Sequence, residues 1–174
     1  MLRVNWSHDT PTLRRDGHDV CHIRHAPLRF RRVKSWMEET KQLARRNGYV
    51  LTIAGRRRYL NDIQSEDNGK RSQAERQAIN TVIQGSAADL MKTAMIRLSE
   101  NLQSWQEGDR RPKMVLQIHD EVLLELMFNE EDIKKMHAVA VKSCCRDCEE
   151  LFNLKVPLLL KCSCGLSFGS MKEI

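Results

Sequence analysis

The chain has 174 residues, of which 41% are hydrophobic and 30% charged, and this length is sufficient for one buried core. The mean hydropathy is −0.54, and no apolar run approaches membrane-spanning length, which argues against a membrane partner. The N-terminus also lacks an apolar run before a small-residue cleavage site, so we expect a soluble, intracellular protein.

The net charge of +6 is distributed unevenly along the chain. Residues 1–60 contain 14 Lys and Arg but only 5 Asp and Glu, a balance of +9, whereas residues 61–174 carry −3. A basic half beside a mildly acidic half favours a partner with dense negative charge, and phosphate backbones are the commonest such partner. A solvated basic surface with no partner is the alternative.

Residues 1–29 have no sustained period of 3.6 or 2. They combine Pro11 and Pro27 with scattered arginines and with His18, His22 and His25. No paired acidic or cysteine ligands accompany the histidines at useful spacing, so we interpret this stretch as a divergent, poorly ordered basic arm rather than a metal site.

The next elements form a basic α/β segment. Apolar residues at spacings of three and four predict a helix over residues 31–47, which Gly48 ends. Tyr49–Ile53 predicts a short strand, Gly55 a turn and Arg56–Tyr59 the returning strand, before a polar loop over residues 61–69.

A long helix is predicted from about Ser72 to Leu102, with Gly85 as its weak point. Its apolar stripe is expected to contain Ile79, Ile83, Ala87, Leu90, Met91, Ala94 and Leu98. Arg76, Asn80 and Gln84 are four residues apart and therefore share a second, polar face. Such a row can form a comb of hydrogen-bond donors along a groove, and a plain solvated helix face is the alternative.

The C-terminal third predicts a β-hairpin, a helix and a strand. Residues 114–126 read as two strands joined at His119-Asp120-Glu121, which lifts carboxylates to a tip, although an ordinary polar turn is commoner. Asn129 is expected to cap a helix with acids in its first turn that ends near Leu151. Residues 156–162 predict a buried strand and 165–174 a short tail. The fold class is therefore α+β.

The six cysteines permit another interpretation of the chain, as a structural domain held together by a zinc site. Cys145-x-x-Cys148 and Cys162-x-Cys164 could supply four thiolates. However, Cys144 and Cys148 are spaced with Met136 and Ala140 on the apolar stripe of a predicted helix. Buried free cysteine behaves as a small hydrophobe, and we favour that role.

From about Phe30 to its end, the chain resembles the family A DNA polymerases (the Pol I type), and the animal enzymes most. The matching blocks are residues 48–50 with 55–59, 74–80, 84–90 and Gln117-Ile118-His119-Asp120-Glu121-Val122. The resemblance implies the C-terminal part of a polymerase palm with a fragment of the fingers. Residues 30–174 would form a partial polymerase domain, with fingers over 30–70 and palm over 71–174.

The resemblance also implies roles for single residues. Asp120, with Glu121 beside it, would hold Mg²⁺ in a two-metal site, and His119 would contact the primer end. Arg76, Asn80 and Gln84 would reach the DNA minor groove near the primer terminus. Arg56, Arg57 and Arg58 would contact backbone phosphates. The implied partners are primer–template DNA and deoxynucleoside triphosphates, and the implied location is the nucleus.

Two parts that the family's site requires are missing from residues 1–29. These are a second catalytic aspartate on an earlier palm strand and a fingers helix whose Arg and Lys bind nucleotide phosphates. We therefore expect a truncated form with an incomplete metal site, inactive alone and with exposed apolar surface. A non-catalytic module that binds primer–template DNA is the alternative.

Overall fold

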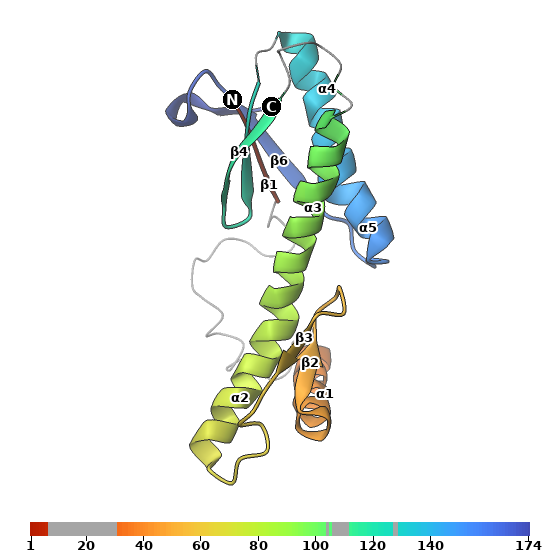
Figure 1. The fold of residues 1–174 in the computed structure, drawn as a ribbon. Coiled ribbons are helices and arrows are strands. Elements are labelled where there is room, and N and C mark those ends of the chain that lie inside the picture. The colour runs from red at the N-terminus through yellow and green to blue at the C-terminus, as the bar shows by residue number, and fades with distance from the viewer. Residues whose placement is uncertain (7–30, 104, 106–111, 127–128) are drawn as a thin grey trace. The chain divides into compact units, whose positions relative to one another are not determined.

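The computed structural model describes residues 1–6, 31–103, 105, 112–126 and 129–174 (Figure 1). Contacts divide the chain into two compact units, one of Met1–Pro11 with Leu90–Ile174 and one of Thr12–Asp89. The division follows Asp89 rather than residue 70, and the assignment to fingers and palm stays a prediction. Among the described helices, none has the length and apolar character needed to cross a membrane.

The first unit is built on an antiparallel five-stranded sheet in the order β4-β5-β1-β6-β7. Its strands are β1 (Leu2–Trp6), β4 (Lys113–Ile118), β5 (Glu121–Glu125), β6 (Leu160–Cys164) and β7 (Lys172–Glu173). A bulge between Met114 and Leu116 interrupts the β4–β5 ladder. Side chains from β1, β5, β6 and the flanking helices form one core, in which Leu2, Leu124 and Met136 are almost completely buried.

Strand β1 corrects our expectation for the start of the chain. We expected residues 1–29 to be a poorly ordered arm, but Leu2–Trp6 form a strand hydrogen-bonded to β5 on one side and β6 on the other. Leu2 and Val4 alternate with polar residues, and their burial in the core gives the strand its stability. Residues 7–29 lie outside the described residues.

The helix after the hairpin confirms its predicted start and end. Helix α4 (Glu130–Val141) begins with a capping box between Asn129 and Asp132, and it continues through a π-helical segment η4 (Lys142–Arg146) into α5 (Asp147–Leu151). The predicted apolar stripe is also confirmed, since its members are at most 3% exposed: Met136, Ala140, Cys144 and Cys148.

The second unit packs α1 (Arg31–Asn47) and a two-stranded sheet of β2 (Tyr49–Leu51) and β3 (Arg57–Tyr59) against α2 (Asn68–Asn80). Gly48, with φ of 76°, ends α1 as predicted. The small core of this unit contains Ala44, Val50, Leu60, Ile63, Ala74 and Ala78. An ion pair between Arg45 and Glu75 joins α1 to α2.

The long helix departs from an ideal α-helix at its middle. Between α2 and α3 (Ser86–Gln103) lies a π-helical segment, η2 (Thr81–Gly85). Ile83 is 54% exposed and Ala87 is exposed, although both were expected on the apolar stripe. The wider turn changes the phase of the helix, so that burial resumes at Asp89, Met91, Ala94 and Leu98.

Three smaller boundaries also differ from the prediction. The expected strand over residues 156–162 is β6, which begins only at Leu160. The predicted tail contains a 3₁₀ turn (Phe168–Ser170) and β7. The expectation of exposed apolar surface is confirmed on the edge strand β4, where Val115, Leu116 and Ile118 are 40–51% exposed.

Candidate functional site

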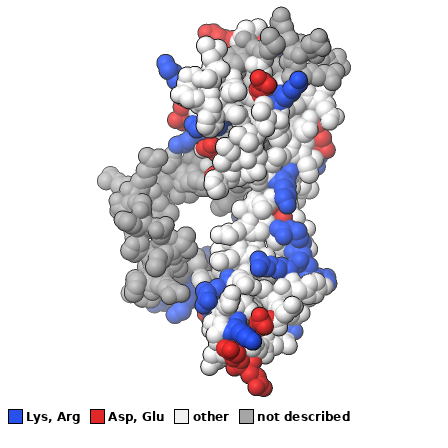
Figure 2. All heavy atoms as spheres, turned by 60° about the vertical axis from the view of Figure 1, so that its left-hand side comes forward, with Lys and Arg blue, Asp and Glu red and all other residues white. Residues whose placement is uncertain are grey.

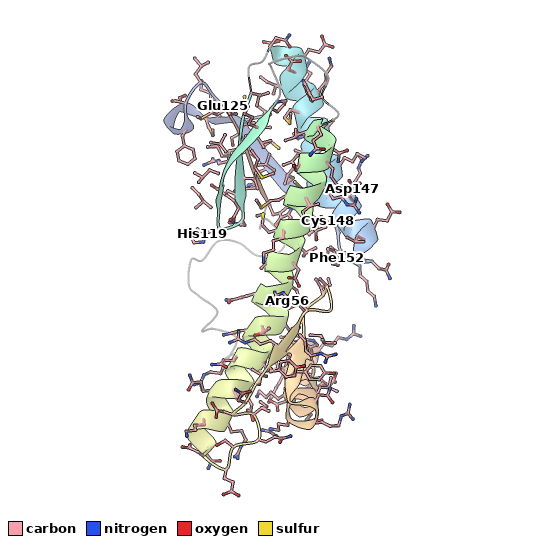
Figure 3. All side chains as sticks on the ribbon, viewed as in Figure 1. Arg56, His119, Glu125, Asp147, Cys148 and Phe152 are labelled. Atoms are coloured by element: carbon pink, nitrogen blue, oxygen red, sulfur yellow. The ribbon has the colours of Figure 1, made fainter. Side chains whose placement is uncertain are left out.

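His119-Asp120-Glu121 form the tip of the β4–β5 hairpin, as the sequence predicted (Figure 3). Ile118 pairs with Glu121, which leaves a two-residue loop. Such loops favour primed turns with positive φ, and His119 has φ of 52°. The strained backbone at His119 therefore follows from the tightness of the turn that presents the carboxylates.

Strand β1 brings a polar side chain to one of these carboxylates. Asn5 lies opposite Glu121 in the β1–β5 register, and its Nδ2 donates a hydrogen bond to Glu121 Oε1 at 3.2 Å. The next residue, Trp6, donates from its indole nitrogen to the Cys144 carbonyl at 3.1 Å. Neither contact was foreseen, although the alternation Leu2-Arg3-Val4-Asn5 is a strand signal.

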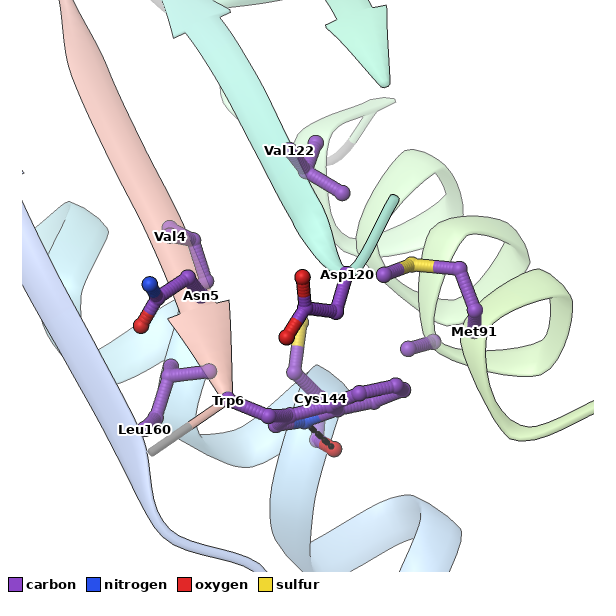
Figure 4. A pocket seen from close by; sticks show the side chains of 9 residues that line it. Val4, Asn5, Trp6, Met91, Asp120, Val122, Cys144 and Leu160 are labelled. Atoms are coloured by element: carbon purple, nitrogen blue, oxygen red, sulfur yellow. Dashed lines mark hydrogen bonds between the residues drawn. The ribbon is translucent and has the colours of Figure 1, made fainter. Parts of the chain in front are cut away.

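A small cavity lies beside Asp120. It is lined by Asn5, Trp6, Asp120 and apolar side chains from β1, β5, β6, α3 and the Cys144 segment (Figure 4). Its volume is about 10 Å³, close to the minimum that one water molecule requires. On this side of the half-buried Asp120, the cavity therefore has room for about one water molecule at most.

The carboxylates at the tip do not fit a cage for two divalent cations. Among the described residues, no three His, Cys, Asp or Glu side chains are grouped so that they could hold a metal ion. Mg²⁺ requires oxygen ligands in near-octahedral geometry, with carboxylates to balance its charge. The structure supplies Asp120 and Glu121 and, from β1, a neutral amide.

The cysteines resemble core residues rather than metal ligands. Burial raises the pKa of the Cys144 and Cys162 thiols to about 12, and that of Cys145 and Cys148 to about 11. Among the described residues, no three Cys, His, Asp or Glu side chains are grouped so that they could hold a metal ion, so the two cysteine pairs do not form a zinc cage there. Cys21 lies outside the described residues.

The predicted donor row lies on the surface of α2 and η2. Arg76, Asn80 and Gln84 are all exposed, and Ile83 is exposed among them. Gln84 belongs to the π-helical segment, so the three side chains follow a row that the wider turn displaces from ideal α-helical spacing. Their exposure makes this face accessible to a macromolecular partner, but a role in the DNA minor groove stays a prediction.

The three consecutive arginines differ in their contacts. Arg56 donates from Nε to the buried carboxylate of Asp89 at 3.0 Å and from a terminal nitrogen to the Gly85 carbonyl at 3.2 Å. Arg58 donates to the Thr81 hydroxyl at 3.0 Å. Arg56 and Arg58 therefore tie the β2–β3 hairpin to the long helix, and any phosphate contact would come in addition.

Arg57 has a different environment, on the exposed face of β3. Its guanidinium lies 4.5 Å from the centre of the Tyr49 ring, and it donates to the Tyr59 hydroxyl. The two tyrosine rings meet edge to face at 5.8 Å. Among the described residues, Arg56 pairs with the Asp89 carboxylate, whereas neither Arg57 nor Arg58 makes an ion pair. A phosphate contact by any of the three arginines stays a prediction.

Asp89 is a buried acid that sequence reasoning missed. Burial raises its pKa, but the Thr52 hydroxyl and the Arg56 guanidinium together lower it below the ordinary value. The carboxylate is therefore charged at neutral pH and fixes Arg56.

Figure 2 shows many Lys and Arg side chains on the surface of the unit Thr12–Asp89, as the basic composition of residues 1–60 predicts.

Comparisons with known proteins show which proteins this chain is similar to. The model of the family described as DNA polymerase family A matches residues 23–170. DNA polymerase I of Caldicellulosiruptor bescii is 42% identical over 144 residues, which cover 83% of this chain and 16% of that protein. DNA polymerase theta of Drosophila melanogaster is 35% identical over 150 residues, or 83% of this chain and 7% of that protein.

A solved structure shares the fold. The POL domain of Pol1 from M. smegmatis, in complex with a DNA primer-template and dNTP, superimposes with a TM-score of 0.71 at 32% identity. The match covers 84% of this chain and 24% of that one. The chain thus spans a sixth or less of the length of the two curated relatives.

Proposed function

Because the chain belongs to DNA polymerase family A, we propose that it serves DNA-directed DNA synthesis, in which a nucleotide is transferred to a primer 3′ end. Members of this family are generally metal-dependent. The proposed partners are primer–template DNA and deoxynucleoside triphosphates, and the proposed location is the nucleus. Within the family we propose an enzyme of the polymerase nu type, from the resemblance of the matching blocks.

For the chain by itself, the best-supported activity is binding of primer–template DNA. The exposed row of Arg76, Asn80 and Gln84 carries this proposal. Minor-groove acceptors are nearly the same for A·T and G·C pairs, so a row of donors there can bind any sequence of correct pairs. Arg57 adds a cation for the phosphate backbone, and phosphate contacts supply most sequence-independent affinity.

We propose that the chain alone does not extend primers. In the polymerase reaction, Mg²⁺ would polarise the primer hydroxyl and the phosphates. Asp120 and Glu121 are the proposed ligands and His119 the proposed contact to the primer end. The two carboxylates with the neutral Asn5 make an incomplete site, and positioning and charge stabilisation supply most of the catalysis in phosphoryl transfer.

The binding test is fluorescence anisotropy with a labelled primer–template and the full chain, at several salt concentrations. The triple variant R76A/N80A/Q84A should bind roughly tenfold or more weakly, because each lost hydrogen bond contributes about 1 kcal/mol. R97A is the matched control, since it removes one arginine from a different part of the same helix. Equal affinity of the triple variant and R97A would contradict the proposed face.

The catalytic test is primer extension with Mg²⁺ and all four nucleotides, beside Asp120→Ala. We expect no extension by either protein. Extension that disappears in the Asp120→Ala variant would show that the chain completes a metal site after all.

A further inference from the structure

The position of Asn5 suggests why the hairpin carboxylates do not form a cation site. Residues directly opposite on paired antiparallel strands bring their side chains within contact distance on one face. Asn5 and Glu121 are such a pair, and the Asn5 amide nitrogen is 3.2 Å from Glu121 Oε1. The partial positive charge of an amide N–H₂ therefore faces the carboxylate where a cation would otherwise balance it.

Trp6 holds this strand end in place. Its indole donates to the Cys144 carbonyl, and its ring closes the cavity below the Asp120 carboxylate (Figure 4). Asn5 on β1 and Asp120 in the β4–β5 turn line the same cavity. The other end of the Asn5 amide, Oδ1, is buried, and within the described chain it has no hydrogen-bond partner.

We infer that position 5 controls whether the hairpin tip binds a divalent cation, and that Asn5 keeps the affinity in the millimolar range. An uncharged amide oxygen is a weaker ligand than a carboxylate, and the affinity of oxygen sites for divalent cations rises with their charge. An aspartate at position 5 would add a third carboxylate beside Asp120 and Glu121. This inference concerns metal affinity and does not depend on DNA binding.

The test compares the full-length wild type with Asn5→Asp by Mn²⁺ titration, followed by electron paramagnetic resonance of the free ion. Mn²⁺ is a suitable probe because it accepts the same oxygen ligands as Mg²⁺. The wild type should bind Mn²⁺ only at about millimolar concentration or above, and Asn5→Asp should bind at least about tenfold more tightly. Micromolar binding by the wild type, or unchanged binding by Asn5→Asp, would overturn the inference.

The double variant N5D/E121Q is the matched control. It exchanges the amide and the carboxylate between the two strands, so that the hydrogen-bonded pair and the number of carboxylates stay as in the wild type. We expect it to bind Mn²⁺ as weakly as the wild type. Tight binding by this variant would show that the number of carboxylates does not set the affinity.

Thermal unfolding gives a second readout. Without metal, Asn5→Asp places two like charges opposite each other and should lower the Tm. Addition of Mn²⁺ should restore the Tm of Asn5→Asp and leave those of the wild type and Asn5→Ala unchanged. If Asn5→Asp does not fold without metal, the wild-type titration remains a test, because micromolar binding of Mn²⁺ by the wild type would overturn the inference.

Discussion

Arg56 and Asp89 form an ion pair in which one partner is buried and the other half-exposed. The Arg56 side chain is 50% exposed and that of Asp89 is 8% exposed, at an N–O distance of 3.0 Å. Removal of Arg56 leaves a buried charge without its cation, whereas removal of the Asp89 charge leaves a guanidinium that water can solvate.

The two single variants should therefore differ in stability. We expect Arg56→Ala to lower the free energy of unfolding by roughly 2–3 kcal/mol and Asp89→Asn by only about 1–2 kcal/mol. Chemical denaturation at pH 7 measures both values. A larger loss for Asp89→Asn than for Arg56→Ala would contradict this account of the pair.

The same pair predicts a dependence on pH. The folded pKa of Asp89 is below its ordinary value of 3.8. A lowered folded pKa contributes stability above the unfolded pKa and loses it as the pH falls through the folded pKa. The difference in unfolding free energy between wild type and Asp89→Asn should be constant from about pH 5 to 7 and shrink below the ordinary pKa. Urea denaturation of the wild type and Asp89→Asn at each pH measures this difference in unfolding free energy.

Gly85 allows a close approach between the long helix and the β2–β3 hairpin. A Cβ at this position would lie 2.8 Å from Thr52 Cγ2. Gly85→Ala should therefore cost roughly 1–3 kcal/mol of stability through overpacking, despite the better helix propensity of alanine.

Thr52→Ser provides the control for this prediction. Serine lacks the clashing methyl group but keeps the hydroxyl that accepts from the Arg56 amide. In the Thr52→Ser background, Gly85→Ala should cost clearly less, as measured by a double-mutant cycle of thermal unfolding. An equal cost in both backgrounds would show that the methyl contact is not the cause.

The buried cysteines should be slow to react. With pKa values of about 11–12, Cys144, Cys145, Cys148 and Cys162 carry little thiolate at pH 8. Iodoacetamide labelling followed by peptide mapping should modify the half-buried Cys164 before these four. Preferential labelling of the four buried thiols in the native protein would contradict their burial in the core. A bound-zinc assay on the purified protein should find no stoichiometric zinc.

Leu2 tests the structural role of β1. Its side chain is 1% exposed, so Leu2→Ala should lower the unfolding free energy by roughly 2–5 kcal/mol through lost burial and the cavity that remains. Arg3→Ala, on the other face of the same strand, should change stability by less than about 1 kcal/mol. Similar effects of the two substitutions would indicate that β1 does not belong to the core.

Local signals in the sequence predicted many of these elements correctly. The Gly48 stop, the Asn129 cap and the Met136-Ala140-Cys144-Cys148 stripe all depend on neighbours within one or two turns, and all were confirmed. β1 was missed because five residues are too short for a clear period, and its stability comes from pairing with strands far along the chain. The π-helical segment was missed for a related reason, since hydrophobic periodicity assumes one constant turn.

In the candidate site, too, local features were predicted from the sequence and long-range contacts were not. The hairpin tip that carries residues 120 and 121 and the helix face that carries residues 76, 80 and 84 were predicted from the sequence and are found in the structure, whereas the roles of these residues stay predictions. The contacts of Asn5 with Glu121 and of Arg56 with Asp89 link residues 116 and 33 positions apart. Without the sheet register, nothing in the sequence relates these partners.

The central place of β1 in its sheet also constrains how the protein can fold during synthesis. The strand precedes both of its partners, β5 and β6, by more than a hundred residues along the chain. Strand pairs so far apart in sequence form slowly, because the chain must first close a large loop, at an entropic cost, before any stabilising contact is made. Until the strands pair, the apolar side chains of Leu2 and Val4 are exposed to water and accessible to chaperones. We expect refolding of the sheet to be slow and its yield to fall as protein concentration rises.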